Sequence, residues 1–514
     1  MGMSDSPHLQ VRTRTCRAMA AAVPHKLLDV EVIRTERDPT RPPSHHIVPA
    51  TSDWTSFFQA TETRGPKKEK KPTGFRNPWP SWHKATAAEV WNQLSWGDEG
   101  PDPCVELAAS HLQGQPAAEK PPPTDVRPNF SDITSWPDSM GAKAARLLRI
   151  EKPDFSVPES SSNWKAKATW LGHASALLQL PPLAPTSRPL ACLFDPIFSM
   201  RCSPSQMAGP VRSYPAPCEA SDLPALDAVF ISHNHYDHLD CDSIRTIWKE
   251  NRETVRFFVP LGNKQWFIDC GISQDRITEL DWWDSAHLSL PGHDRALKIT
   301  CTPAQHGSGR SGGDTGSTLW ASWCIEHPGD NRPYRVFFAG DTGYQFHDSP
   351  DWPPAPDQTS EEGQEAEDTK FPACPAFAEI RDRLGPPQLL LLPISVGATY
   401  AYLRSLVALP DSMSPVPRHS VGLAGAAHMP AWDAVRVLKL MTEGEGGERP
   451  VAIAIHWGTF VTEGIEVLRT LGQLEWACKK QGVEFGRSLP AGDGLEEGVR
   501  PLFLAVNHGQ SVCI

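Results

Sequence analysis

The chain has 514 residues, enough for two or three average domains or for one large α/β domain with extensions. Its formal net charge is -12 and its basic runs are short, so it offers no broad positive surface to a phosphate backbone and we expect no nucleic-acid partner. The 12 cysteines form no Cys-x-x-Cys pair, which disfavours a zinc finger or a disulfide framework, and no apolar run approaches the ~18 to 20 residues that cross a bilayer.

The N-terminal region, residues 1–72, is rich in proline and charge and holds few apolar runs, so we expect a disordered extension. Two patterns in it bear on localisation. Residues 11–22 carry three arginines and no acid, as transit peptides do, and residues 1–6 fit the N-myristoylation pattern. Because both patterns are short, we expect a cytoplasmic protein and leave mitochondrial targeting and N-myristoylation open.

The composition and patterning of the chain change three times after this region. Residues 73–164 hold tryptophans in proline-broken sequence, which predicts an irregular arm packed on a core. Residues 165–512 alternate short apolar strands with turns and helices, which predicts one α/β domain. A proline- and acid-rich stretch at about 349–370 interrupts this domain, and we expect a solvated surface insertion there.

The predicted strands are apolar runs bounded by turn residues, and the predicted helices follow a residue suited to a helix start. The strands are at 169–180, 190–194, 228–232, 297–302, 335–339, 389–394 and 451–455. The helices are at 243–251, with Asp242 as N-cap, and at 432–441, after Pro430.

A dense cluster of potential metal ligands follows the predicted strand that ends at Ser232. The cluster reads His-x-His-x-Asp-His and comprises His233, His235, Asp237 and His238. Imidazole and carboxylate suit zinc, but so short a loop cannot wrap four ligands around one ion at ~2.0–2.2 Å. The spacing therefore predicts a site for two metals at the end of a strand.

Other predicted strands end on further potential ligands. His306 follows the strand at 297–302, Asp341 follows that at 335–339, and His456 follows that at 451–455. A single buried histidine in such a place is often an ordinary core residue. Three residues that share this context with the main cluster instead favour one common metal site.

These motifs resemble the metallo-β-lactamase superfamily. The resemblance implies an α/β fold, a four-layer αβ/βα sandwich with an N-terminal extension, and two Zn²⁺ per chain. It implies one zinc on His233, His235 and His306, a second on Asp237, His238 and His456, and Asp341 with a hydroxide bridging both.

Longer blocks resemble one family in particular, the N-acylphosphatidylethanolamine-hydrolysing phospholipases D, over about residues 74–510. The blocks are at 77–79, 169–175, 194–199, 203–206, 231–240, 301–306, 339–343 and 454–460. The resemblance implies cleavage of a phospholipid to N-acylethanolamine and phosphatidic acid, catalysis by Asp237, Asp341 and His428, and peripheral contact with a membrane surface. A homodimer is left open.

Matching motif by motif gives further roles within this resemblance. His173 and Asp195 match residues that orient the ligands, and the matches to the substrate-binding region are Gln206, Tyr236, His428 and His508. Each of these four could also be an ordinary hydrogen-bonding residue of a pocket wall. The chain departs from the family pattern at Ala427, where the family carries an amide side chain.

Two other functions stay in competition. One is a hydrolase of a soluble phosphate ester or lactone, since the superfamily hosts many chemistries. The other is a metal-binding scaffold without catalysis. Product analysis on a phospholipid separates all three.

Overall fold

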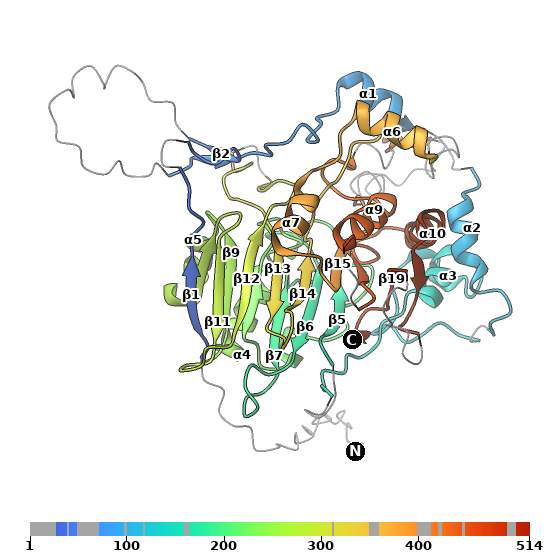
Figure 1. Ribbon diagram of the computed structural model, residues 1–514. Helices are drawn as coiled ribbons and strands as arrows, with labels where there is room; N and C mark the ends of the chain where they lie inside the picture. Colours follow the sequence, from blue (N-terminus) through green and yellow to red (C-terminus); the bar gives the residue numbers. More distant parts are fainter. Residues whose placement is uncertain are drawn as a thin grey trace, which may run out of the picture.

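The chain forms two facing β-sheets with helices on their outer faces (Figure 1). The computed structural model describes residues 27–38, 41–48, 71–96, 100–116, 119–158, 164–310, 313–348, 359–397, 413–419, 424–444, 448–490 and 500–514. The two N-terminal targeting patterns, at 1–6 and 11–22, lie outside this part of the chain.

The first sheet has seven strands in the order β10-β9-β8-β7-β6-β5-β20. Its strands are β5 (Lys167–Gly172), β6 (Ser175–Leu180), β7 (Leu190–Phe194), β8 (Ala228–Phe230), β9 (Arg256–Pro260), β10 (Ile277–Leu280) and β20 (Ser511–Cys513). The run from β7 to β10 is parallel, so the loops that follow β7 and β8 leave from the same edge of the sheet.

The second sheet has nine strands in the order β1-β11-β12-β13-β14-β15-β17-β19-β18. Its strands are β1 (Asp29–Ile33), β11 (Ser285–Ser289), β12 (Ala296–Thr302), β13 (Ser322–His327), β14 (Tyr334–Phe338), β15 (Leu389–Pro393), β17 (Val451–Ile455), β18 (Glu484–Gly486) and β19 (Leu502–Leu504). Strands β14, β15, β17 and β19 are parallel, and β12 runs the same way because β13 lies antiparallel between it and β14.

Alternating side chains of β8 bind the layers together. Val229 faces outward and packs with Ile244 of α4 (Cys241–Asn251) and Phe267 of α5 (Lys264–Asp269). The next residue, Phe230, faces inward, and its ring lies 5.5 Å from Trp323 of the other sheet. This period of two is what a strand buried on both faces requires.

The remaining helices lie mostly on the outer face of the nine-stranded sheet (Figure 1). They are α7 (Ala376–Leu384), α9 (Ala431–Thr442) and α10 (Gly464–Gln481), with α2 (Pro103–Ser110) and α3 (Met140–Leu147) packed against α10. Short elements complete the fold: α1 (Ala87–Gln93), α6 (Glu361–Lys370), η1 (Ser131–Thr134), η2 (Ala220–Asp222), η3 (Gln274–Arg276) and the pairs β2 (His46–Ile47) with β3 (Gly74–Phe75) and β4 (Leu94–Ser95) with β16 (Arg418–His419). The layers run helix, sheet, sheet, helix, which is the predicted four-layer sandwich.

The contact between α2 and α10 depends on a glycine. A Cβ added at Gly472 would lie 1.9 Å from the backbone oxygen of Cys104. Gly472→Ala should therefore lower the free energy of unfolding, because the overpacking cost of ~1–3 kcal/mol or more exceeds the ~1 kcal/mol gain in helix propensity. Urea unfolding measures this change. Gly100→Ala, where an added Cβ meets nothing within 4 Å, should leave the midpoint unchanged, and equal midpoints for both variants would contradict the close contact.

Three predictions of local structure are corrected. The extension expected to be disordered contains β1, whose backbone pairs with β11 although its side chains are mostly exposed. The strand expected at 169–180 is two strands, because the chain turns between β5 and β6 with His173 at φ 49°. Helix α4 begins two residues earlier than expected: its N-cap is Asp240, whose side chain accepts from the backbone N–H of Ser243.

The two irregular regions also carry helices. The arm at 73–164 contains α1, α2, η1 and α3, rather than irregular chain alone. The second half of the acidic insertion forms α6, and there Asp368 accepts from Arg436 Nη2 at 3.0 Å, while Glu367 lies 2.8 Å from His347 Nδ1. This segment forms a helix because Ser360 caps it and its Glu, Gln and Ala residues favour helix. The contacts of Asp368 and Gln364 with α9 keep the helix from being fully solvated. Within the described residues, no helix has the length and apolar character to cross a membrane.

Candidate metal centre

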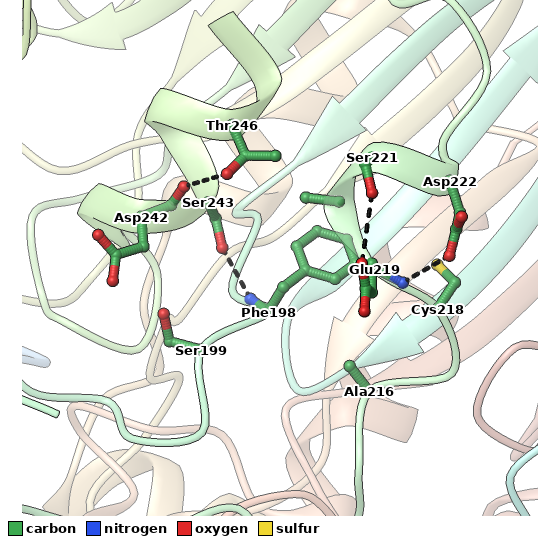
Figure 2. Close-up of a pocket in the computed structure, with 11 residues that line it drawn as sticks. Phe198, Ser199, Ala216, Cys218, Glu219, Ser221, Asp222, Asp242, Ser243 and Thr246 are labelled. Atoms are coloured by element: carbon green, nitrogen blue, oxygen red, sulfur yellow. Dashed lines mark hydrogen bonds between the residues drawn. The ribbon is translucent and has the colours of Figure 1, made fainter. Parts of the chain in front are cut away.

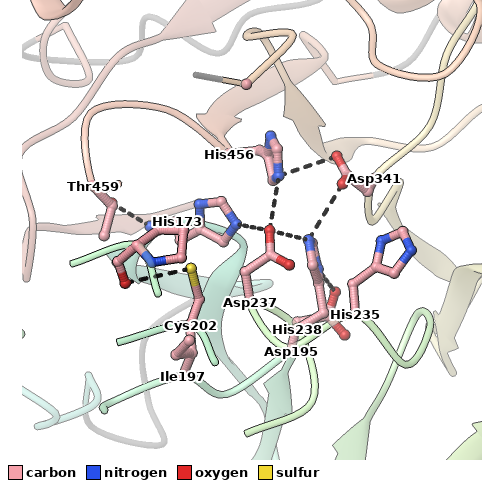
Figure 3. Close-up of polar contacts among 12 residues, drawn as sticks. His173, Asp195, Ile197, Cys202, His235, Asp237, His238, Asp341, His456 and Thr459 are labelled. Atoms are coloured by element: carbon pink, nitrogen blue, oxygen red, sulfur yellow. Dashed lines mark hydrogen bonds and ion pairs between the residues drawn. The ribbon is translucent and has the colours of Figure 1, made fainter. Parts of the chain in front are cut away.

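The seven predicted ligands converge at one edge of the two sheets. The loop after β8 carries His233, His235, Asp237 and His238, and the other three ligands follow β12, β14 and β17, namely His306, Asp341 and His456. Figure 3 shows several of these side chains pointing toward one another. They converge because the carboxyl ends of these strands meet at this edge.

Three histidines form the first group. The Nε2 atom of His233 lies 2.7 Å from Nδ1 of His235, and Nε2 of His306 lies 3.1 Å and 3.2 Å from those two atoms. These three contacts cannot all be hydrogen bonds, because each ring nitrogen offers either a proton or a lone pair. Nitrogen ligands of a tetrahedral ion at ~2.0–2.1 Å are separated by about 3.3 Å, so the spacing fits one shared cation.

The second group surrounds Asp341. Its Oδ2 lies 3.4 Å from His238 Nε2, and its Oδ1 lies 3.2 Å from His456 Nε2. The Oδ2 atom of Asp237 lies 3.6 Å from His238 Nε2. Both oxygens of Asp341 and both of these histidine nitrogens are buried without a hydrogen-bond partner. Buried polar atoms left in this way are costly unless a cation binds them, so this group also fits a metal.

The charges of the two groups differ. Burial lowers the pKa of His233 and His306 well below the usual value and that of His235 to about 3, so all three are neutral, as metal ligands must be. Burial opposes ionisation of Asp341, but His456, His428 and His306 outweigh it and hold its pKa well below the usual range. Burial also disfavours the charged forms of His238 and His456, but Asp237 and Asp341 outweigh it and raise the pKa of His238 to about 10 and that of His456 to about 9. Without a metal these two imidazoles hold protons that a bound divalent cation would displace.

Asp195, at the end of β7, contacts His238 of the second group directly and His233 of the first group through Ser232. Its Oδ2 accepts from His238 Nδ1 at 2.8 Å and from Ser232 Oγ at 2.5 Å. The same Ser232 Oγ lies 2.9 Å from His233 Nδ1. A carboxylate behind a ligating imidazole fixes its tautomer and orientation.

His173 supports Asp237 in the same way. Its Nε2 lies 3.0 Å from Asp237 Oδ2, and its backbone N–H donates to Thr459 Oγ1 at 2.6 Å. Its backbone oxygen accepts from the N–H of His456 at 2.8 Å. His173, Asp195 and His456 all have positive φ, between 38° and 58°, which is strained for residues with a side chain. The strained backbone positions therefore lie at or beside the candidate ligands.

Several residues at the centre were given no role there by the sequence analysis. Asn77 Nδ2 donates to the backbone oxygen of His306 at 2.6 Å. The backbone oxygen of Ala427 lies 2.9 Å from Nδ1 of the same histidine. Arg310 Nη2 donates to Asp237 Oδ1 at 3.1 Å, and 48% of the Arg310 side chain is exposed. Arg310 stands in a Gly- and Ser-rich loop where no periodicity marks it.

The four predicted substrate contacts lie in different surroundings. His428 is at the centre, with Nε2 3.2 Å from Asp341 Oδ2 and 23% of its side chain exposed. Tyr236 is exposed on the ligand loop. The amide of exposed Gln206 closes its own loop through two 3.0 Å hydrogen bonds to the backbone of Arg201. His508 is fully buried, and its Nε2 lies 3.3 Å from Thr459 Oγ1.

A separate surface pocket of about 640 Å³ lies beside the start of α4 and η2 (Figure 2). Its lining contains none of the predicted ligands or substrate contacts. Three carboxylates stand in its wall, those of Glu219, Asp222 and Asp242, and they disfavour an anionic headgroup. We assign no part of the metal chemistry to this pocket.

The role of Asp195 is testable through metal affinity. Asp195→Asn should weaken metal binding ~10–100-fold. The carboxylate of Asp195 accepts hydrogen bonds with both oxygens, from Ser232 and His238, whereas an amide has one accepting oxygen and an NH₂ group that only donates. Competition with a metallochromic chelator measures this affinity. Asp330→Asn, at an exposed turn between β13 and β14, is the matched control and should bind metal like the original protein. Equal affinities in the two variants would remove Asp195 from the site.

Comparison with known proteins places this site in a family. A β-lactamase superfamily domain model matches residues 191–359. An uncharacterised protein of Mycobacterium tuberculosis is 32% identical over 68% of this chain and 81% of its own length. The N-acyl-phosphatidylethanolamine-hydrolysing phospholipase D 1 of Caenorhabditis elegans is 32% identical over 57% of this chain and 64% of its own length.

A yeast relative extends the match. The mitochondrial N-acyl-phosphatidylethanolamine-hydrolysing phospholipase D of Saccharomyces cerevisiae is 29% identical over 69% of this chain and 61% of its own length. These matches confirm the predicted fold and family. The chain is a metal-dependent hydrolase of the metallo-β-lactamase superfamily and belongs to the family of the N-acyl-phosphatidylethanolamine-hydrolysing phospholipases D.

Proposed function

We propose that this protein is a zinc-dependent phosphodiesterase of phospholipase D type that hydrolyses N-acylphosphatidylethanolamine to N-acylethanolamine and phosphatidic acid. The observation that carries the proposal is the convergence of two ligand groups on Asp341, whose oxygens are both buried without a hydrogen-bond partner. The names of the worm and yeast relatives support the substrate. Two zinc ions, one for each group, suit the set of imidazoles and carboxylates.

The residues at the centre suit this reaction. When bound, two divalent cations supply an activated water at neutral pH and neutralise charge on a phosphoryl group. Arg310 adds a partly exposed positive charge beside Asp237, where it can hold a phosphate oxygen. His428 is partly exposed beside Asp341, and we assign it the proton that the departing ethanolamide oxygen takes up.

The bonds exchanged are these. The oxygen of water bonds to phosphorus, and the bond from phosphorus to the ethanolamide oxygen breaks. Because the substrate lies in a bilayer, we also propose peripheral contact with a membrane surface. The yeast relative is named mitochondrial, and organelle fractionation of the full chain would test whether residues 11–22 direct import.

The test is hydrolysis in ¹⁸O-labelled water. Purified, zinc-loaded protein is incubated with vesicles that contain N-acylphosphatidylethanolamine, and the products are identified by mass. The proposal expects N-acylethanolamine without label and phosphatidic acid carrying one ¹⁸O. Release of diacylglycerol or free fatty acid would show that another bond is cut, and hydrolysis of soluble phosphate esters or lactones alone would replace the lipid substrate.

A further inference from the structure

A third group of potential metal ligands lies away from the metal centre, where the N-terminal extension meets the nine-stranded sheet. His46, the first residue of β2, and His45 just before it face Asp281, which follows β10. One donor atom from each of the three side chains lies within 4.8 Å of the other two, as in each of the two groups of the metal centre. All three side chains are at least nine-tenths buried.

The contacts within this group resemble those at the metal centre. His45 Nε2 lies 2.7 Å from Asp281 Oδ1, and His46 Nε2 lies 2.9 Å from Asp281 Oδ2. Despite the 2.9 Å separation, His46 Nε2 and Asp281 Oδ2 are both buried without a hydrogen-bond partner, so this contact lacks hydrogen-bond geometry. His456 Nε2 and Asp341 Oδ1 show the same combination of close approach and missing hydrogen bond.

The chemistry of the group suits zinc. Burial lowers the pKa of His45 even though Asp281 raises it, so the imidazole is neutral and has a lone pair to offer. Burial opposes ionisation of Asp281, but His45 and His46 hold the pKa of its carboxyl well below the usual range. Two imidazoles and one carboxylate are a common protein ligand set for zinc.

The surrounding charges predict weaker binding than at the metal centre. Arg37 Nη2 lies 3.2 Å from Asp281 Oδ2 and 2.8 Å from Asp284 Oδ1, and Arg34 Nη1 lies 2.7 Å from Asp284 Oδ2. Two guanidinium groups and two carboxylates cancel, so no net negative charge draws a cation to this group. The affinity must come from the donor atoms themselves.

We propose that His45, His46 and Asp281 bind a third zinc ion, which ties the N-terminal extension to the catalytic domain. The ion would add to the other attachments of the extension, which are the pairing of β1 with β11, the ion pairs of Arg34 and Arg37 with Asp284, and the two-residue pairing of β2 with β3. A series of side-chain contacts connects this group to the metal centre. The His45 ring stacks on Trp282 at 4.2 Å, and Trp282 stacks at 5.3 Å on Trp79, two residues after the Asn77 that holds His306.

The test is the zinc content of the full-length chain. Protein equilibrated with micromolar free zinc is separated from unbound metal and analysed by mass spectrometry of the element. The proposal expects three zinc ions per chain, and two in His46→Gln and in Asp281→Asn. His287→Gln is the matched control, because His287 lies on neighbouring β11 with 35% of its side chain exposed, and it should keep three. The two ions retained by the variants show that the metal centre is folded.

The outcomes distinguish this site from the catalytic one. Two zinc ions in the original protein, or the same zinc content in the original protein and both variants, would overturn the proposal. His45, His46 and Asp281 would then form ion pairs without a metal. Trypsin gives a second readout at Arg34, Arg37 and Arg41. Zinc should slow cleavage there in the original protein but not in His46→Gln, and equal slowing in both would contradict the site. Neither readout depends on which lipid the enzyme hydrolyses.

Discussion

Asp341→Ala is expected to lower kcat by on the order of 10³-fold or more and to remove most of the bound zinc from both ligand groups. The reason is that Asp341 faces both groups: its Oδ2 lies 3.6 Å from His306 Nε2, and its Oδ1 lies 3.2 Å from His456 Nε2. Without this carboxylate, the remaining ligands are mostly neutral imidazoles, and two divalent cations would repel each other across the gap. Elemental analysis and initial rates on lipid vesicles measure the two effects.

The matched control is Asp294→Ala, at an exposed turn between β11 and β12. It should keep both the zinc content and the rate of the original protein. Full zinc occupancy in Asp341→Ala would show that this residue is not a ligand, even if the rate fell. A variant that lost zinc but kept its rate would contradict metal-dependent hydrolysis altogether.

His428→Gln is expected to lower kcat ~10²–10³-fold while the zinc content stays at two ions for the metal centre. The distinction follows from position. His428 Nε2 lies 3.2 Å from Asp341 Oδ2, but His428 belongs to neither of the two ligand groups, and its side chain is partly exposed. Loss of its imidazole removes a proton donor beside the substrate without removing a ligand. Steady-state kinetics together with elemental analysis separate these effects.

The control for this variant is His293→Gln, an exposed histidine in the turn between β11 and β12. It should show an unchanged rate. A normal rate in His428→Gln would exclude its catalytic assignment, and a parallel loss of zinc would make it a ligand instead. A substrate whose leaving group is already acidic should be hydrolysed nearly as fast by His428→Gln as by the original protein, because it needs no proton.

The convergence of the seven candidate ligands could be predicted from the sequence because each of them follows an apolar strand. The loop of His233 to His238 is a local signal, and Asp341 and His456 repeat the same strand-then-ligand order far along the chain. A buried parallel strand is legible as an apolar run, and its carboxyl end has a known place in the fold. Predicting that these side chains meet therefore needed little information beyond strand order.

The residues that hold the ligands were harder to predict, because their roles depend on packing. Asn77 precedes His306 by more than 200 positions and acts through the backbone of that histidine. Strand β1 alternates charged and apolar residues in a short proline-flanked stretch, and only the exposed edge of β11 makes it a strand. Asp242 and Asp240 are equally good helix caps by composition, and the placement of Ser243 decides for Asp240.

The most direct measurement is anomalous diffraction at the zinc absorption edge from crystals of the zinc-loaded protein. Our interpretation predicts two strong peaks at one edge of the sheets. One should lie among His233, His235 and His306, the other among Asp237, His238 and His456, with Asp341 contacting both. A peak at only one group, or no zinc among these seven side chains, would contradict a two-metal hydrolase.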